Sequence, residues 1–239
     1  MKKLIVSVIV IVGILCLYTY LKSRDQTVNT TDKNTETGVG VGTSIKAKAG
    51  VPVDSLEWKN SRHLTFRGVP IDGTLKCFVA RMEAVGFECV EKEEGVACLQ
   101  GDFAAFKDCW VYVQTIDGKD LVSTILVTFP EQDQWKNLSG DYAYLKELLT
   151  EKYGKPVSCV ERFQTLSFAP KPDDRDKMYL LKDGNCQYTT RYDTEKGQLV
   201  LSIEYGERMR YSQGACFVML SYLDKINNKV MREYAKGDL

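Results

Sequence analysis

Histidine and cysteine are the residues of this 239-residue chain best suited to chemistry, and they limit what that chemistry can be. The chain holds a single histidine, His63, so any catalytic dyad or triad built on an imidazole has to use it. No G-x-S-x-G segment and no local cysteine motif marks a nucleophile to accompany it. We therefore expect His63, at the edge of the first predicted strand, to be a structural side chain, and we assign no catalytic residue.

The spacing of the cysteines argues against a metal site. Apart from Cys16, the seven are Cys77, Cys89, Cys98, Cys109, Cys159, Cys186 and Cys216. None of them is paired as C-x2-C, and a single histidine cannot complete a zinc set, so we predict no metal and no cofactor. Two interpretations stay open: disulfides, if the body faces an oxidising compartment, or small buried apolar side chains. Since seven is odd, at least one thiol stays unpaired in a monomer.

One cysteine pair could form a bridge if the local hairpin has the right register. A symmetric hairpin turning in Lys92 to Gly95 would set Cys89 opposite Cys98, at a separation that a disulfide can span. A three-residue turn ending at Gly95 would shift the register and prevent the bridge. Cys89 and Cys98 are therefore the candidate disulfide of this sequence.

Two groups of aspartates could bind a cation or act as acid and base. Asp102 and Asp108 flank the segment GDFAAFKD, and Asp173, Asp174 and Asp176 cluster in PKPDDRD. Turns commonly use aspartate for its hydrogen bonds to nearby backbone, and no EF-hand spacing or partner glutamate is present. We interpret both groups as turns and leave the ligand-binding residues unassigned.

Periodicity predicts the elements that must position these residues. Apolar residues fall at i, i+3, i+4, i+7 and i+10 from Leu75 to Val85, which is typical of a helix, and similar stripes predict helices over 139–153 and 224–235. Between them lie short β-like runs with turns, including FECVE, GVACLQ and LVSTILVTF in the first half and PVSCVERF, MYLLKD and QLVLSIEYG in the second. The prediction is an α+β domain: an antiparallel sheet of hairpin-connected strands with about three helices packed on one face.

The first 60 residues differ from the rest in composition. Residues 1–24 contain the apolar run LIVSVIVIVGILCLYTYL, which as a helix of ~27 Å would nearly match a bilayer of ~30 Å. We predict an uncleaved transmembrane signal-anchor, with a cleaved export signal as the alternative. Residues 25–60 resemble a flexible tether, and residues 61–239 form a single α+β domain. The domain would then lie outside the cytoplasm in a bacterial cell envelope, with the lipid bilayer as one partner.

Several segments of the domain carry a resemblance to a known family. FRGVPIDGTL, GDFAAFKDCWVYV, VTFPEQDQW, LKELLTEKYGKP and CFVMLSYLDKIN resemble recurrent segments of a family of small exported proteins of unknown function from gut Bacteroidetes. The resemblance covers about His63 to Leu239. It implies an exported single-domain α+β protein, and it implies no catalytic residues. Members of the family open with a cleavable export signal directly before the HLTF-like segment, whereas this chain has a longer apolar run and an inserted tether.

Charge and the lack of catalytic motifs narrow the function. The first 60 residues hold eight Lys or Arg and five Asp or Glu, which leaves 24 and 27 in the rest, a mildly acidic balance that argues against nucleic acid as a partner. We predict a non-enzymatic binding or interaction module for an unknown protein, peptide or glycan. The alternative is an enzyme whose site consists of dispersed residues that sequence motifs do not reveal.

Overall fold

The computed structural model describes residues 61–164, 171–208 and 211–237. Within them the elements follow in this order: β1 (Thr65–Phe66), β2 (Val69–Pro70), α3 (Leu75–Ala84), β3 (Glu88–Glu93), β4 (Val96–Phe103), β5 (Phe106–Thr115), β6 (Val122–Thr128), α4 (Trp135–Tyr153), β7 (Ser158–Phe163), α5 (Asp174–Lys182), β8 (Cys186–Asp193), β9 (Gly197–Arg208), β10 (Tyr211–Asp224) and α6 (Lys225–Gly237). The predicted anchor (1–24) and tether (25–60) lie outside the described residues.

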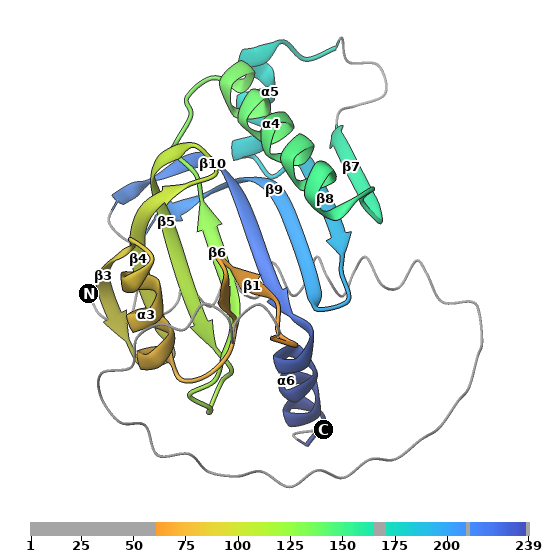
Figure 1. The fold of residues 1–239 in the computed structure, drawn as a ribbon. Coiled ribbons are helices and arrows are strands. Elements are labelled where there is room, and N and C mark those ends of the chain that lie inside the picture. Colours follow the sequence, from red (N-terminus) through yellow and green to blue (C-terminus); the bar gives the residue numbers. More distant parts are fainter. Residues whose placement is uncertain (1–60, 165–170, 209–210, 238–239) are drawn as a thin grey trace, which may run out of the picture. The chain divides into compact units, whose positions relative to one another are not determined.

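Eight strands form one sheet in the order β3-β4-β5-β6-β10-β9-β8-β7 (Figure 1). Every neighbouring pair with a described register is antiparallel. The sheet thus contains two groups of four neighbouring strands, β3 to β6 and β7 to β10, and each group follows a helix, α3 or α4. In the second group, α5 lies between β7 and β8 in the chain. The last strand of one group pairs with the last strand of the other, so the first strands, β3 and β7, form the two edges of the sheet.

The register places apolar rows across the middle of the sheet. Leu99, Val111, Val127 and Leu220 are cross-strand partners on β4, β5, β6 and β10, and all four belong to the buried core. Because successive side chains of a strand alternate between faces, the next residues along these strands occupy the opposite face. Each of these strands therefore has one row of side chains that faces the core and a second row on the opposite face of the sheet.

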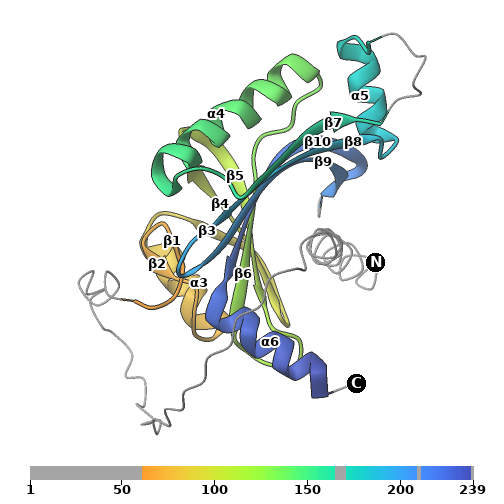
Figure 2. The ribbon, with the colours of Figure 1, turned by 90° about the vertical axis from the view of Figure 1, so that its right-hand side faces the viewer.

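Helix α3 begins and ends at residues that the sequence marks. The Thr74 side chain accepts a hydrogen bond from the Cys77 amide at 3.3 Å, which caps the first turn. Its apolar side chains Phe78 and Met82 are fully buried in the core. The helix packs against β3, β4 and β5, and α4 lies on the same side of the sheet (Figure 2).

The α+β prediction is confirmed, with a sheet that is antiparallel in every described register and four helices in the described ranges. Helix α4 begins at Trp135, one turn earlier than the predicted 139. Helix α5 lies where the sequence predicts a strand at MYLLKD. Its start is fixed by a capping box in which Asp173 accepts from the Asp176 amide at 2.9 Å and the Asp176 carboxylate accepts from the Asp173 amide at 3.2 Å.

The predicted transmembrane signal-anchor requires a correction. Across the residues described here, no helix combines the length and the apolar character that crossing a bilayer demands. The longest of them, α4, has 19 residues but carries charged side chains such as Lys146, Glu147 and Glu151. The membrane assignment has no support in this structure, and residues 4–21, on which it rested, lie outside the described part of the chain.

Candidate functional site

A hollow of about 420 Å³ lies between helix α4 and the edge strand β7, and we call it the α4–β7 hollow. It is lined by Ser139, Tyr142, Ala143, Lys146, Glu147, Thr150 and Glu151 of α4, by Glu161 of β7 and by Tyr188 of β8. Charged and hydroxyl groups from three separate elements therefore converge on one space, which makes it a candidate ligand site.

Hydrogen bonds of hydroxyl groups join α4 to strand β8. The Tyr142 hydroxyl lies 2.6 Å from the Thr190 hydroxyl, and both residues are buried. The Tyr192 hydroxyl donates to the Lys146 carbonyl at 3.0 Å and lies 2.9 Å from the Thr150 hydroxyl. These bonds satisfy polar groups that would otherwise be costly to bury, and they fix the wall of the hollow.

An ion pair and a thiol lie where β7 meets α4. Lys146 Nζ lies 2.5 Å from Glu161 Oε1. The Cys159 thiol donates to Glu161 Oε1 at 3.3 Å and accepts from Lys146 Nζ at 3.6 Å and from the Thr190 hydroxyl at 3.4 Å. Cys159 and Glu161 both contact Lys146, so these two side chains of β7 face α4, and Glu161 lines the hollow.

The pKa shifts keep these groups in their ordinary protonation states. The hydrogen bond to Glu161 raises the pKa of Lys146. Loss of hydration alone would raise the pKa of Glu161, but the hydrogen bonds from Lys146 and Cys159 outweigh it and lower that pKa. Burial raises the pKa of Tyr142 and of Tyr188. Each shift moves a pKa away from neutrality, so at neutral pH the hollow presents fixed charges and neutral hydroxyls.

Aromatic rings support the hollow from below. The Tyr188 ring meets Trp135 at 5.0 Å and Tyr142 at 5.7 Å between centroids, both edge to face, and Phe163 packs against Trp135 at 4.8 Å. Such pairs add stability beyond the area that they bury. The Tyr188 ring, which lines the hollow, is therefore held by contacts with two rings of α4.

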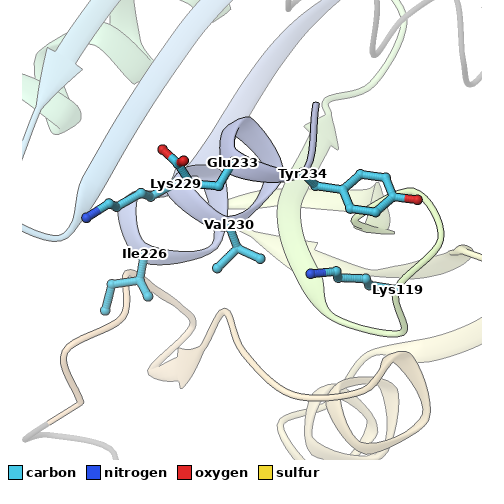
Figure 3. Close-up of a pocket in the computed structure, with 6 residues that line it drawn as sticks. All are labelled: Lys119, Ile226, Lys229, Val230, Glu233 and Tyr234. Atoms are coloured by element: carbon cyan, nitrogen blue, oxygen red, sulfur yellow. The ribbon is translucent and has the colours of Figure 1, made fainter. Parts of the chain in front are cut away.

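A second hollow, of about 460 Å³, lies between α6 and the turn joining β5 to β6 (Figure 3). Ile226 and Val230 point to the same side of α6, and Lys119 reaches toward them from the turn. The Lys119 ammonium lies 5.4 Å from the centre of the Tyr234 ring, so a cation–π contact joins the helix to the turn. This hollow is mainly apolar, and we interpret it as the packing interface between α6 and the β5–β6 turn.

His63 lies outside both hollows and connects two ends of the domain. Its Nδ1 is 3.1 Å from Asp224 Oδ1, and its Nε2 is 3.5 Å from Asp72 Oδ2. Asp224 is fully buried and also accepts from the Leu64 and Asn227 amides, each at 2.8 Å. These contacts join the segment before β1 to the start of α6, which is a structural role.

The aspartate groups lie where a turn and a helix begin. Asp102 accepts from the Asp108 amide at 3.3 Å and pairs with Lys107 at the exposed β4–β5 turn. Asp173 and Asp176 cap α5 as described above. In the ranges that the structure covers, no three His, Cys, Asp or Glu side chains are placed to hold a metal ion.

The observed register differs from the one that a Cys89–Cys98 bridge requires. A bulge between Cys89 and Glu91 sets Cys89 opposite Leu99 and Cys98 opposite Glu91. The seven cysteines in the described residues form no disulfide with one another. Cys98, Cys109 and Cys216 are buried, as the apolar interpretation proposes, whereas Cys77 and Cys159 are exposed.

Sequence reasoning missed the residues of the α4–β7 hollow. Tyr142, Lys146 and Thr150 recur at i, i+4 and i+8, and Glu147 and Glu151 follow the same spacing beside them. This polar stripe flanks the apolar face of the predicted helix and is the local signal that could have suggested a site. Its partners on β7 and β8 come from a part of the sequence that no motif connects to the helix.

Comparisons of the chain with protein-family models, with curated proteins and with solved structures found no match. The resemblance to exported proteins of gut Bacteroidetes therefore stays a prediction.

Proposed function

We propose that this protein is a non-enzymatic binding module and that the α4–β7 hollow is its ligand-binding surface. The observation that carries the proposal is the ion pair of Lys146 and Glu161, set at 2.5 Å among buried hydroxyl groups. The pair offers a donor and an acceptor at fixed positions. Together with the Tyr188 ring, it can orient a polar ligand.

The electrostatics favour binding over catalysis. A general acid or base works best with a pKa near the working pH. The pKa of Glu161 is lowered and that of Lys146 is raised, so both groups stay charged at neutral pH. A cysteine nucleophile paired with an imidazole is also unsupported, because the side-chain partners described for His63 are Asp72 and Asp224 rather than Cys159.

A paired set of variants tests the proposal. The full chain is applied to a peptide array and to a glycan array, and each is repeated with the double variant Lys146→Met/Glu161→Gln. The control is Lys107→Met/Asp102→Asn, which removes an exposed lysine–carboxylate pair from the β4–β5 turn. We expect the first variant to lose most of the binding seen for the unmodified chain and the control to keep it.

Two outcomes would contradict the proposal. One is binding that survives Lys146→Met/Glu161→Gln at full strength, which would place the ligand elsewhere. The other is a chain that binds no peptide and no glycan.

A further inference from the structure

The outer edge of β7 offers backbone hydrogen bonds to a further strand. In the residues that the structure describes, β7 has one neighbouring strand, β8. Every second residue of an edge strand directs its N–H and C=O groups away from its neighbour. The register from Ser158↔Arg191 to Phe163↔Cys186 contains no shift, so these outward groups follow the spacing of a regular ladder.

The other edge strand, β3, carries features that protect it, and in the described ranges β7 carries fewer of them. Strand β3 has four charged side chains among six residues and a bulge between Cys89 and Glu91, and both features discourage pairing with another strand. Strand β7 has two charged side chains, and both are engaged within the protein. Glu161 pairs with Lys146 of α4, and Arg162 donates to Gln187 of β8 at 3.0 Å.

The charge of the adjoining hollow selects the kind of strand that would fit. One lysine and three glutamates line the α4–β7 hollow, so its lining has a formal charge of −2. Lys146 is paired with Glu161, while Glu147 and Glu151 are exposed one turn apart on α4. A lysine or arginine side chain entering the hollow would face these two carboxylates.

We propose that β7 and the α4–β7 hollow bind an extended, basic segment of another protein by strand addition. The backbone of the segment pairs with the outer edge of β7. Its side chains alternate, and those on the α4 side of the sheet enter the hollow, where a lysine or arginine meets Glu147 and Glu151. The inference rests on the proposed function and names the class of ligand.

Synthetic peptides about as long as β7 test the charge preference on the full chain. Each has a β-prone, neutral background and a central Lys, Arg, Ala or Glu. We expect the Lys and Arg peptides to bind about tenfold more tightly than the Ala peptide, and the Glu peptide to bind more weakly still. The preference should shrink as salt is raised, because the carboxylates are exposed.

Backbone methylation tests strand addition separately. The Lys peptide is methylated on every second backbone nitrogen, in each of the two registers. One register blocks the N–H groups that face β7, and the other leaves them intact, so we expect one peptide to lose binding and the other to keep it. Equal binding by both methylated peptides would overturn strand addition.

A pair of charge variants locates the basic side chain. Glu147→Gln/Glu151→Gln should weaken the binding of the Lys peptide about tenfold and leave the binding of the Ala peptide unchanged. The matched control, Glu91→Gln/Glu93→Gln, removes the same charge from the β3 edge. It should leave the binding of both peptides unchanged. Circular dichroism verifies that both variants fold.

The remaining outcomes separate this inference from the proposed function. If a glycan binds and Lys146→Met/Glu161→Gln abolishes that binding, the hollow is a binding site but the peptide inference is wrong. Self-association of the full chain through β7, detected by sedimentation and abolished by the Lys peptide, would also overturn it, since the occupant would be a second copy. If substitutions in the hollow affect no ligand, both proposals fail.

Discussion

The two halves of the domain have similar orders of elements, with α5 inserted between β7 and β8 in the second half, but they pack their helices differently. In each half a helix precedes four strands, and the first of these strands forms an edge of the sheet. Helix α3 meets its strands through buried apolar side chains such as Phe78 and Met82. Helix α4 also packs aromatic rings on β7 and β8, but its contacts with these strands include hydroxyl hydrogen bonds and an ion pair as well.

This difference shows where a binding surface can exist in such a sheet. Apolar packing closes the space under α3 and gives stability. The longer polar side chains along α4 leave a hollow with defined donors and acceptors, and they contribute less stability per contact. We therefore expect the first half to govern stability and the second half to govern ligand binding.

The largest effect is expected from Phe78→Ala in the first half. Phe78 is fully buried, so its removal leaves a cavity and should lower the free energy of unfolding by about 3 to 5 kcal/mol. Urea denaturation followed by circular dichroism measures the change. Lys76→Ala, at an exposed position of the same helix, should change the free energy of unfolding by less than about 0.5 kcal/mol. Equal effects of Phe78→Ala and Lys76→Ala would refute the role assigned to the apolar interface.

Two glycines should respond in opposite directions. A Cβ at Gly101 would lie 2.7 Å from Cδ1 of the buried Phe87 ring, so Gly101→Ala should destabilise the protein by about 1 to 3 kcal/mol. A Cβ at Gly140 of α4 meets no atom within 4 Å, and Gly140→Ala should stabilise by about 0.5 to 1 kcal/mol. Thermal melts compare the two, and changes of the same sign would contradict the contrast between the halves.

Removing a hydroxyl from the second half should cost less. Tyr142→Phe deletes the bond to Thr190 and should lower the free energy of unfolding by about 1 kcal/mol. Tyr144, on the same helix, is 42% exposed, and Tyr144→Phe serves as the matched control with no expected change. A double-mutant cycle with Thr190→Val measures the coupling, and a value of zero would show that this bond does not hold α4.

The smallest effect is a pH dependence of the Lys146–Glu161 pair. The folded pKa of Glu161 lies below its ordinary value of 4.5, so the pair stabilises the fold above that pH and loses its contribution as the pH falls through the folded value. Both side chains are about one-third exposed, so solvent screening limits the contribution to about 0.2 to 1 kcal/mol. Thermal melts between neutral and acidic pH should show this loss of stability in the unmodified chain and a smaller loss in Lys146→Met. Identical pH profiles of the two would show that the pair does not stabilise the fold.

Helices α3 and α5 show how far local sequence signals reach. The stripe from Leu75 to Val85 predicted α3 almost to its ends, because both its apolar period and its Thr74 cap lie within a few residues. Helix α5 was missed, although Asp173 and Asp176 form a capping box of the kind that precedes a helix. Its short apolar run, MYLLKD, fits a strand as well as a helix, and packing of Met178 and Leu181 into the core decides between them.

The hollow and the cysteine register could not be predicted in the same way. Lys146 and Glu161 lie on different elements, and nothing local to either residue indicates that their side chains meet. The bulge at Cys89 and Glu91 adds a residue to one strand. It shifts the alternation of side chains and changes which residues oppose each other, and no local motif marks its position.

By itself, the sequence of this protein determined its α+β class and the positions of most helices and strands, because the period of apolar residues reports local burial. Only the tertiary structure decided that β6 pairs with β10, which leaves β3 and β7 at the edges and α4 beside β7. The physical reason is that strand pairing joins backbone groups far apart in the chain, and its register depends on packing that no local pattern encodes.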